Sequence, residues 1–283
     1  MAQQIHWFPG HMNKALNEVE NKVKLVDVVI ELLDARAPLS SINENLEKLI
    51  QNKKKLIVLT KIDLADQEVT KEWINFFKEK YDSVLTLDLK KSGAEAILSK
   101  AVINLGKDKW AKEKAKGMKP QPIRAMIVGI PNVGKSSLIN RLAKRKAAGV
   151  QNKPGFTRGE QWIKVNQDFL LLDTPGILPM NYENQKKAAN LALIGSIRED
   201  ILPNETLGQI LLDYFKIRYP SALNARFGIE EIGDRITVLN QIAEKRKLVD
   251  GVGQNDLLRA EALLLKEFKD GLLGQITLEV YGA

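Results

Sequence analysis

Eight residues near the middle of the chain have the spacing of a phosphate-binding loop. The segment begins at Gly129 and ends in Gly134-Lys135-Ser136, which matches the pattern G-x-x-x-x-G-K-[ST]. In such a loop, main-chain N–H groups turn toward phosphate oxygens and the serine hydroxyl can bind Mg²⁺. We expect Lys135 to act in both binding and catalysis, because its cation would lie beside the β and γ phosphates. The residues expected to bind the nucleotide here are Asn132, Val133, Gly134, Lys135, Ser136 and Ser137.

Two segments downstream of this loop could complete a nucleotide site. Asp173-Thr-Pro-Gly176 closes a buried apolar run. Asp173 could therefore hold a Mg²⁺-bound water, and the Gly176 N–H could meet a γ phosphate. Thr157 lies between the two motifs in a loop that contains glycine, and it is a second candidate ligand for Mg²⁺. Each segment alone could be an ordinary turn, but their order after the phosphate loop favours a metal site.

A third motif, Thr60-Lys61-Ile62-Asp63, matches the pattern [NT]-K-x-D that reads guanine. Its aspartate accepts hydrogen bonds from guanine N1–H and the 2-amino group, which adenine cannot supply, and the lysine stem can lie against the base. The alternative is a strand-to-helix turn that Asp63 caps. We expect Thr60, Lys61 and Asp63 to bind guanine. The usual following motif, Ser-Ala-Lys, is matched only loosely, by Leu-Asp-Leu-Lys at residues 87–90.

The pattern of apolar residues predicts an α/β fold with a largely parallel sheet. Branched apolar runs predict strands at residues 26–33, 55–60, 83–87, 124–129 and 169–173, with an edge strand at 161–165. Helical spacing predicts helices at residues 70–80, 94–105 and 136–142. Beyond residue 200 it predicts three helices at 204–219, 230–248 and 255–269. Asn204 and Asn255 are the expected N-caps.

The order of the motifs is permuted, because the guanine motif precedes the phosphate loop. The usual sheet survives this order if the chain is cut after the Asp-x-x-Gly segment and the old termini are joined. Residues 106–122, rich in lysine and interrupted by glycine and proline, stand where that joint is required, and we predict a linker with a short charged helix. We therefore expect a circularly permuted P-loop GTPase domain at residues 1–178 and an all-helical domain at residues 179–283.

Composition limits the class of protein. The chain has no cysteine, which excludes a disulfide framework, a thiol nucleophile and a zinc site built on sulfur. Neither a signal peptide nor an apolar run of membrane-spanning length is visible, so we expect a cytoplasmic protein without a membrane role. The net charge is +8, with 33 basic against 23 acidic residues in positions 1–200. This excess favours a polyanionic partner. We expect a monomer that binds RNA and not DNA.

Further motifs give the chain a resemblance to a known family. Trp7-Phe-Pro-Gly-His11-Met12 stands near the start, Asp34-Ala-Arg36-Ala-Pro38 follows the first strand, and Asp256-x-x-Arg259-Ala260 lies in the last helix. With the permuted order, these motifs resemble the circularly permuted GTPases of bacterial large-subunit maturation over nearly the whole chain. The resemblance implies binding to a late precursor of the large ribosomal subunit, contact of the C-terminal helices with ribosomal RNA, and hydrolysis of GTP to GDP coupled to release.

The resemblance also bears on catalysis. A Ras-like enzyme positions the attacking water with a glutamine after Asp-x-x-Gly, but Ile177 stands there in this chain. The resemblance points to His11 as the substitute, and the permutation would bring the segment before the first strand near the γ phosphate. An imidazole could orient or deprotonate water near neutral pH, although a histidine in a surface turn is the alternative. Asn132 corresponds to an asparagine that helps many related GTPases to bind K⁺.

Two other functions fit part of the sequence. A P-loop ATPase is one, and Asp63 argues against it. A non-enzymatic RNA-binding scaffold gated by nucleotide is the other, suggested by the missing glutamine. We also expect GTP to order residues 173–176 and thereby to set the angle between the two domains, which would form a composite RNA-binding surface. Residues 201–283 have 10 basic against 12 acidic side chains, so RNA contact there would need a local basic face such as residues 245–247.

Overall fold

The computed structural model describes residues 10–144, 162–172, 185–197 and 202–282. Within these ranges six strands form one sheet in the order β3-β2-β1-β4-β6-β5. Neighbouring strands are parallel except for β5 and β6 at the edge, which are antiparallel. The predicted α/β fold with a largely parallel sheet is confirmed. The strands are β1 Val28–Asp34, β2 Lys54–Thr60, β3 Ser83–Thr86, β4 Ile123–Gly129, β5 Trp162–Lys164 and β6 Phe169–Leu172.

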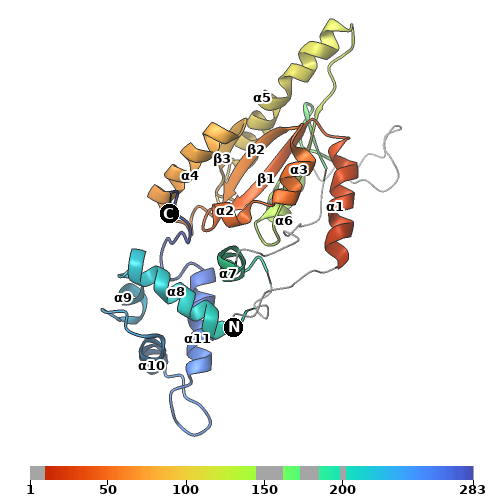
Figure 1. The fold of residues 1–283 in the computed structure, drawn as a ribbon. Coiled ribbons are helices and arrows are strands. Elements are labelled where there is room, and N and C mark those ends of the chain that lie inside the picture. Colours follow the sequence, from red (N-terminus) through yellow and green to blue (C-terminus); the bar gives the residue numbers. More distant parts are fainter. Residues whose placement is uncertain (1–9, 145–161, 173–184, 198–201, 283) are drawn as a thin grey trace.

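Helices cover both faces of this sheet (Figure 1). Successive side chains of β1 enter different cores, as the two-residue period of a strand requires. Val28, Ile30 and Leu32 pack on the face covered by α5 and α6, whereas Val29 and Leu33 pack on the opposite face. The helices of this part are α1 Gly10–Val23, α2 Pro38–Ser41, α3 Glu44–Ile50, α4 Gln67–Lys80, α5 Ala94–Ala115 and α6 Lys135–Lys144.

Residues 106–122, predicted as a linker with a short charged helix, are for the larger part helical, and the helix predicted at residues 94–105 is longer than its pattern indicated. α5 continues without a break to Ala115, so only the end of the segment connects it to β4. Gly106 lies inside this helix, and its lack of a side chain lets α5 approach the sheet closely. A Cβ atom at this position would lie 2.6 Å from the side chain of Ile123. The glycine is therefore a packing residue here.

Most of the described chain beyond residue 184 is also helical, and the predicted boundary between residues 178 and 179 lies outside the described residues. The three predicted helices are confirmed as α8, α10 and α11, whereas α7 and α9 were not predicted. The bounds are α7 Gln185–Leu193, α8 Asn204–Arg218, α9 Ala222–Phe227, α10 Arg235–Arg246 and α11 Leu257–Lys269.

The predicted N-caps of these helices were wrong. Pro203 occupies the N-cap position of α8, and Asn204 is the first helical residue. Asp256, and not Asn255, caps α11 by accepting a hydrogen bond from a main-chain N–H of its first turn. Since Asp234 caps α10 in the same way, that helix begins later than the apolar pattern indicated. In both cases a carboxylate near the helix N-terminus is favoured by the helix dipole.

After α11 the chain returns to the sheet domain and ends near α4 (Figure 1). Ile276, Thr277 and Leu278 are buried. The N–H of Ile276 donates to the carbonyl of Leu64 at 3.0 Å, and the N–H of Leu278 donates to the carbonyl of Arg36 at 2.7 Å. We call residues 275–279 the C-terminal strap. It joins the helical part to two loops at one edge of the sheet.

We expect Leu278→Ala to lower the free energy of unfolding by about 2–5 kcal/mol, because it leaves a cavity where the strap packs on the sheet domain. Leu272→Ala is the matched control, since that side chain is 50% exposed. Denaturant unfolding of both variants measures the difference. Equal, small losses would contradict the packing of the strap.

Candidate functional site

The phosphate loop connects the end of β4 to the start of α6, as the motif predicts. Its main chain turns through positive φ angles at Gly129 (148°), Asn132 (58°) and Gly134 (110°). Glycine is required at the first position, because a Cβ atom there would lie 2.7 Å from the carbonyl oxygen of Leu32 in β1. Since α6 begins at Lys135, the loop leads directly into a helix N-terminus, where N–H groups and the helix dipole favour an anion.

Lys135 is the first residue of α6 and is almost fully buried. Its ammonium group donates to the carbonyl oxygens of Gly129 at 3.1 Å and Ile130 at 3.0 Å. The cation is therefore held against the main chain of the loop itself. Ser136 and Ser137 follow in the first helical turn, and both are exposed. This arrangement gives the loop a fixed positive charge and hydroxyl groups on its open side.

The loop that follows β2 holds the predicted guanine motif, and Thr60 joins it to the phosphate loop. The buried Thr60 hydroxyl lies 2.7 Å from the carbonyl oxygen of Val133 and 3.2 Å from that of Leu33. Thr60, at the end of β2, therefore contacts both the end of β1 and the phosphate loop. Thr60 and Val133 are 73 residues apart in the sequence. The strand order explains this closeness, because parallel strands end at the same edge of the sheet.

Asp63 lies beside the segment that loosely matches Ser-Ala-Lys. The ammonium of Lys90 donates to the Asp63 carboxylate at 2.6 Å, and this hydrogen bond raises the pKa of Lys90 above its usual value. Leu89 approaches the phosphate loop, since a Cβ atom on Gly134 would lie 2.9 Å from its side chain. Arg141 of α6 donates to the carbonyl of Leu89. Residues 87–90 thus lie between the two motifs.

Asn132 contacts the helical part of the chain. Its side-chain amide donates to the carbonyl of Gly195, in the turn after α7, at 2.7 Å. From its place in the motif, only a role in nucleotide or K⁺ binding was predicted for this residue. Its contact with the turn adds a direct connection between the phosphate loop and the helical part.

Sequence reasoning did not assign a role to the charged pair Asp34 and Arg36 at the end of β1. Both side chains are buried, and the Arg36 guanidinium donates to Asp34 through Nε at 3.0 Å and through Nη2 at 2.9 Å. Asp34 also accepts the ammonium of Lys61 from the guanine motif, at 2.9 Å. A carboxylate directly after a buried strand was the available signal. The same signal, a carboxylate that closes a buried apolar run, drew attention to Asp173.

Several predicted site residues lie outside what the structure describes. These are Thr157, Asp173 and Gly176. His11 falls in the first turn of α1, but its side chain is not among those described. In the described ranges no group of three or more His, Cys, Asp or Glu side chains is arranged to hold a metal ion. The predicted Mg²⁺ ligands therefore stay predictions.

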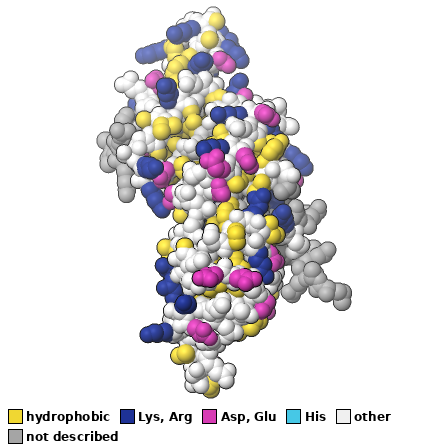
Figure 2. All heavy atoms as spheres, turned by 90° about the vertical axis from the view of Figure 1, so that its left-hand side faces the viewer, with side chains coloured by type: hydrophobic (Ala, Val, Ile, Leu, Met, Phe, Trp, Pro, Cys, Tyr) yellow, Lys and Arg dark blue, Asp and Glu magenta, His cyan; other side chains and the backbone are white. Residues whose placement is uncertain are grey.

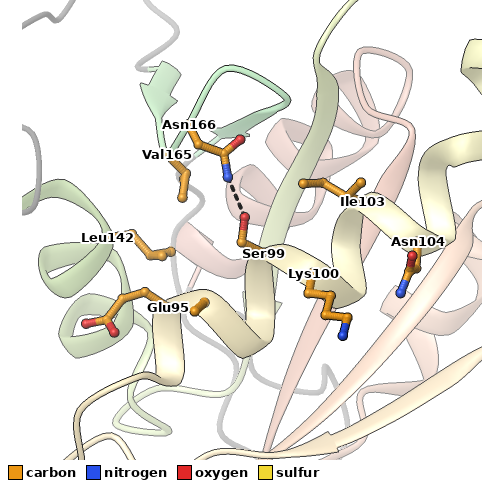
Figure 3. A pocket seen from close by; sticks show the side chains of 9 residues that line it. Glu95, Ser99, Lys100, Ile103, Asn104, Leu142, Val165 and Asn166 are labelled. Atoms are coloured by element: carbon orange, nitrogen blue, oxygen red, sulfur yellow. Dashed lines mark hydrogen bonds between the residues drawn. The ribbon is translucent and has the colours of Figure 1, made fainter.

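A separate hollow of about 480 Å³ lies between α5, α6 and the turn from β5 to β6 (Figure 3). Ser99 and Asn166 lie next to each other in its lining, and the Asn166 amide donates to the Ser99 hydroxyl at 2.5 Å. Its lining includes none of the predicted nucleotide-binding residues. The hollow is thus distinct from the strand-end site.

None of the helices in the described part of the chain combines the length and apolar character of a membrane span.

Comparison with known proteins finds similarity to GTPases, which agrees with a nucleotide site at this edge of the sheet. A family model described as "50S ribosome-binding GTPase" matches residues 124–207. Ribosome biogenesis GTPase A of Bacillus cereus is 43% identical over 97% of this chain and 93% of that protein. Its namesake from Thermotoga maritima is 32% identical over 96% of this chain and 93% of that protein. The solved structure of GNP-bound YlqF from T. maritima has a TM-score of 0.65 and 27% identity, covering 94% of this chain and 98% of its own.

We expect Thr60→Val to raise the dissociation constant for GDP about tenfold, because loss of a buried hydrogen bond frees the phosphate loop from the guanine motif. Titration with fluorescent GDP measures this change. Thr60→Ser keeps the hydroxyl and is expected to bind GDP as the wild type does. A valine variant with unchanged affinity would show that the bridge has no part in binding.

Proposed function

This chain belongs to the ribosome biogenesis GTPase A family and hydrolyses GTP, and we propose that it acts on a late precursor of the large ribosomal subunit. In this proposal the particle stimulates hydrolysis, and hydrolysis is coupled to release. The Thr60 bridge is the observation that carries the nucleotide part, because it holds the phosphate loop and the guanine motif at one edge of the sheet. The ribosomal part is supported by the match to a ribosome-binding GTPase family and by the similarity to ribosome biogenesis GTPases.

The nucleotide contacts in this proposal follow the two loops. Asp63 and Lys61 bind guanine, with Thr60 positioning their loop. At the phosphate loop, Lys135 neutralises phosphate charge, and the N–H groups of Val133 and Gly134 face the oxygens. The remaining contacts are those of Asn132, Ser136, Ser137, Thr157 and Gly176.

The described half of the site fits Mg²⁺, because the Ser136 hydroxyl lies exposed in the first turn of α6 beside the phosphate loop. Ser136 and Thr157 would bind the ion directly, and Asp173 would bind it through water. The metal would supply positive charge to the phosphate oxygens of the nucleotide. A K⁺ ion at Asn132 would add a second fixed charge. Equal hydrolysis rates in Na⁺ and K⁺ buffers would contradict the K⁺ site.

His11 is proposed to orient the attacking water, and the course of α1 supports this. A short turn connects α1 to β1, and α1 packs on the sheet through Leu16, Val19 and Val23. Because the helix runs back along the sheet, its first turn lies toward the edge where β1 ends (Figure 1). The phosphate loop lies at that same edge. This course of α1 supports the proposed role of a histidine in its first turn.

The proposed function predicts that GTP hydrolysis is slow for the protein alone, faster with mature large subunits and fastest with immature particles. The physical reason is that the chain has Ile177 in place of the water-positioning glutamine, so that the particle completes the site. Phosphate release in the three conditions measures it. Equal rates in all three would contradict stimulation by the particle. Absence of turnover in each would favour the nucleotide-gated RNA-binding scaffold.

We expect His11→Ala to lower stimulated turnover on the order of a hundredfold, the scale of a lost general base, with little change in GTP affinity. His6→Ala is the control, because it removes the other of the two histidines. Single-turnover hydrolysis and nucleotide titration separate the two effects. Unchanged turnover in the His11 variant would remove this residue from the mechanism.

Binding to ribosomal RNA is proposed to use the far end of α5, which projects beyond the sheet (Figure 1). Lys and Arg side chains gather around this end of the molecule (Figure 2). Those of Lys112, Lys114, Lys116 and Lys119 are exposed. The alternative basic face at residues 245–247 is partly engaged within the helical part, since Arg246 lies 3.5 Å from Glu267. The α5 end is therefore the better candidate for phosphate contacts.

Reversing charge at the α5 end with Lys112→Glu and Lys116→Glu should weaken binding to immature particles and flatten its dependence on salt, because fewer counterions are released. The control reverses Lys71 and Lys78, two exposed lysines of α4. Binding is measured by co-sedimentation over a salt series. Equal slopes for the two variants would place the RNA contact elsewhere.

A further inference from the structure

Asp34 forms the centre of a buried charged network between the guanine motif and the helical part. One carboxylate oxygen accepts from the Arg36 N–H at 3.1 Å and from Arg36 Nε at 3.0 Å. The other accepts from Arg36 Nη2 and from the Lys61 ammonium, each at 2.9 Å. Asp34 has no exposed surface. A buried carboxylate with this many donors is held firmly, and removal of one charged partner is costly.

The network fixes Lys61 in a defined direction. Lys61 is one of three described non-glycine residues with a positive φ angle (53°), so its main chain makes a tight turn after β2. Its side chain is only one-quarter exposed, and its ammonium ends at Asp34. The stem of the side chain is therefore anchored at both ends, two residues before Asp63. A lysine held in this way presents its stem to a guanine base without first losing rotamer freedom.

Arg36 connects the same network to the helical part. Its Nη1 donates to the carbonyl of Lys269 at the end of α11, at 3.1 Å. Its Nη2 also donates to the carbonyl of Ile194 after α7, at 3.2 Å. The guanidinium lies 5.9 Å from the ring centre of Phe268, within range of a cation–π contact. The main-chain carbonyl of Arg36 accepts from Leu278 of the C-terminal strap.

The strap contacts the main chain of the guanine motif as well. Its Gln275 side chain donates to the Asp63 carbonyl at 3.3 Å, and the hydroxyl of its Thr277 accepts from the Asp66 N–H at 3.0 Å. The Leu64 carbonyl between them accepts from Ile276. The helical part thus reaches the base-reading loop by two routes, through the Arg36 side chain and through the main chain of the strap.

We propose that Asp34 and Arg36 are positioning residues of the guanine site, through which base binding at Lys61 and docking of the helical part on the sheet domain stabilise each other. The proposal deepens the proposed function and rests on the role given there to Lys61. Nucleotide bound at one end of the network favours the arrangement that Arg36 holds at the other. Equal coupling in both directions is required by linkage.

The charge state of Asp34 is consistent with this role. Burial alone raises the pKa of Asp34, but the charges and hydrogen bonds of Arg36 and Lys61 outweigh it and hold this pKa below its usual value. The carboxylate therefore stays ionised near neutral pH. It can hold both cations at once.

A double-mutant cycle on GDP affinity tests the link between Asp34 and Lys61. We expect Asp34→Asn and Lys61→Met each to raise the dissociation constant for GDP about tenfold, and the double variant to bind no more weakly than Lys61→Met alone. The KM for GTP should rise while kcat stays, since the base lies away from the bond that breaks. Independent, multiplying effects would overturn the proposal.

The matched control is Glu267→Gln, which also removes a buried carboxylate bound by an arginine. Arg226 donates to Glu267 at 2.8 Å through both Nε and Nη2, within the helical part. We expect this variant to unfold at lower temperature but to bind GDP with unchanged affinity. An equal loss of GDP affinity would show that general destabilisation, and not positioning, explains the effect of Asp34→Asn. A Lys61→Met variant with wild-type affinity would contradict the role of Lys61 itself.

Hydrogen exchange in the wild-type protein tests the other end of the network without a variant that could fail to fold. We expect GDP to slow exchange of the Ile276 and Leu278 amides several-fold, while amides of α10 change little. Arg36→Lys keeps the charge but loses the planar fork, so it should weaken this response. Unchanged exchange in the strap when GDP is bound would overturn the proposed coupling.

Discussion

The hydroxyl of Thr60 joins the guanine motif to the phosphate loop, and it can do so because the strands that carry these loops end side by side. β2, β1 and β4 are adjacent and parallel, so the loops after them meet at one edge. Thr60 contacts main-chain carbonyls of the other two strand-end segments. The order of motifs along the chain is therefore unimportant for the site. Strand order in the sheet, and not order in the sequence, brings the guanine motif to the phosphate loop.

The helical part contacts each of these three loops. Asn132 of the phosphate loop donates to Gly195, Arg36 after β1 donates to Ile194 and Lys269, and the strap binds the guanine motif. The family to which the chain belongs uses GTP in ribosome biogenesis, as the names of its members state. Through these contacts the helical part lies directly against all three loops.

Local patterns in the sequence predicted the elements that position the site. Branched apolar runs marked β1, β2 and β4, and the glycines of the phosphate loop marked the turn at Gly129 and Gly134. The length of α5 was missed because Gly106 is ordinarily a helix breaker, and its packing against Ile123 is a tertiary fact. The C-terminal strap was missed because its contacts also depend on the tertiary structure and leave no local pattern in the sequence. Its partners lie more than two hundred residues earlier in the chain.

Recognition of guanine by the Asp63 carboxylate distinguishes a GTPase from an ATPase, and an Asp63→Asn variant probes it. An asparagine amide can donate to the 2-oxo group of xanthine, whereas it loses the carboxylate that accepts from guanine. We predict that GTP, but not ATP, displaces labelled GDP from the wild type, and that the variant prefers xanthosine diphosphate to GDP. Equal displacement by ATP, or a variant that keeps its preference for GDP, would rule out guanine recognition by Asp63.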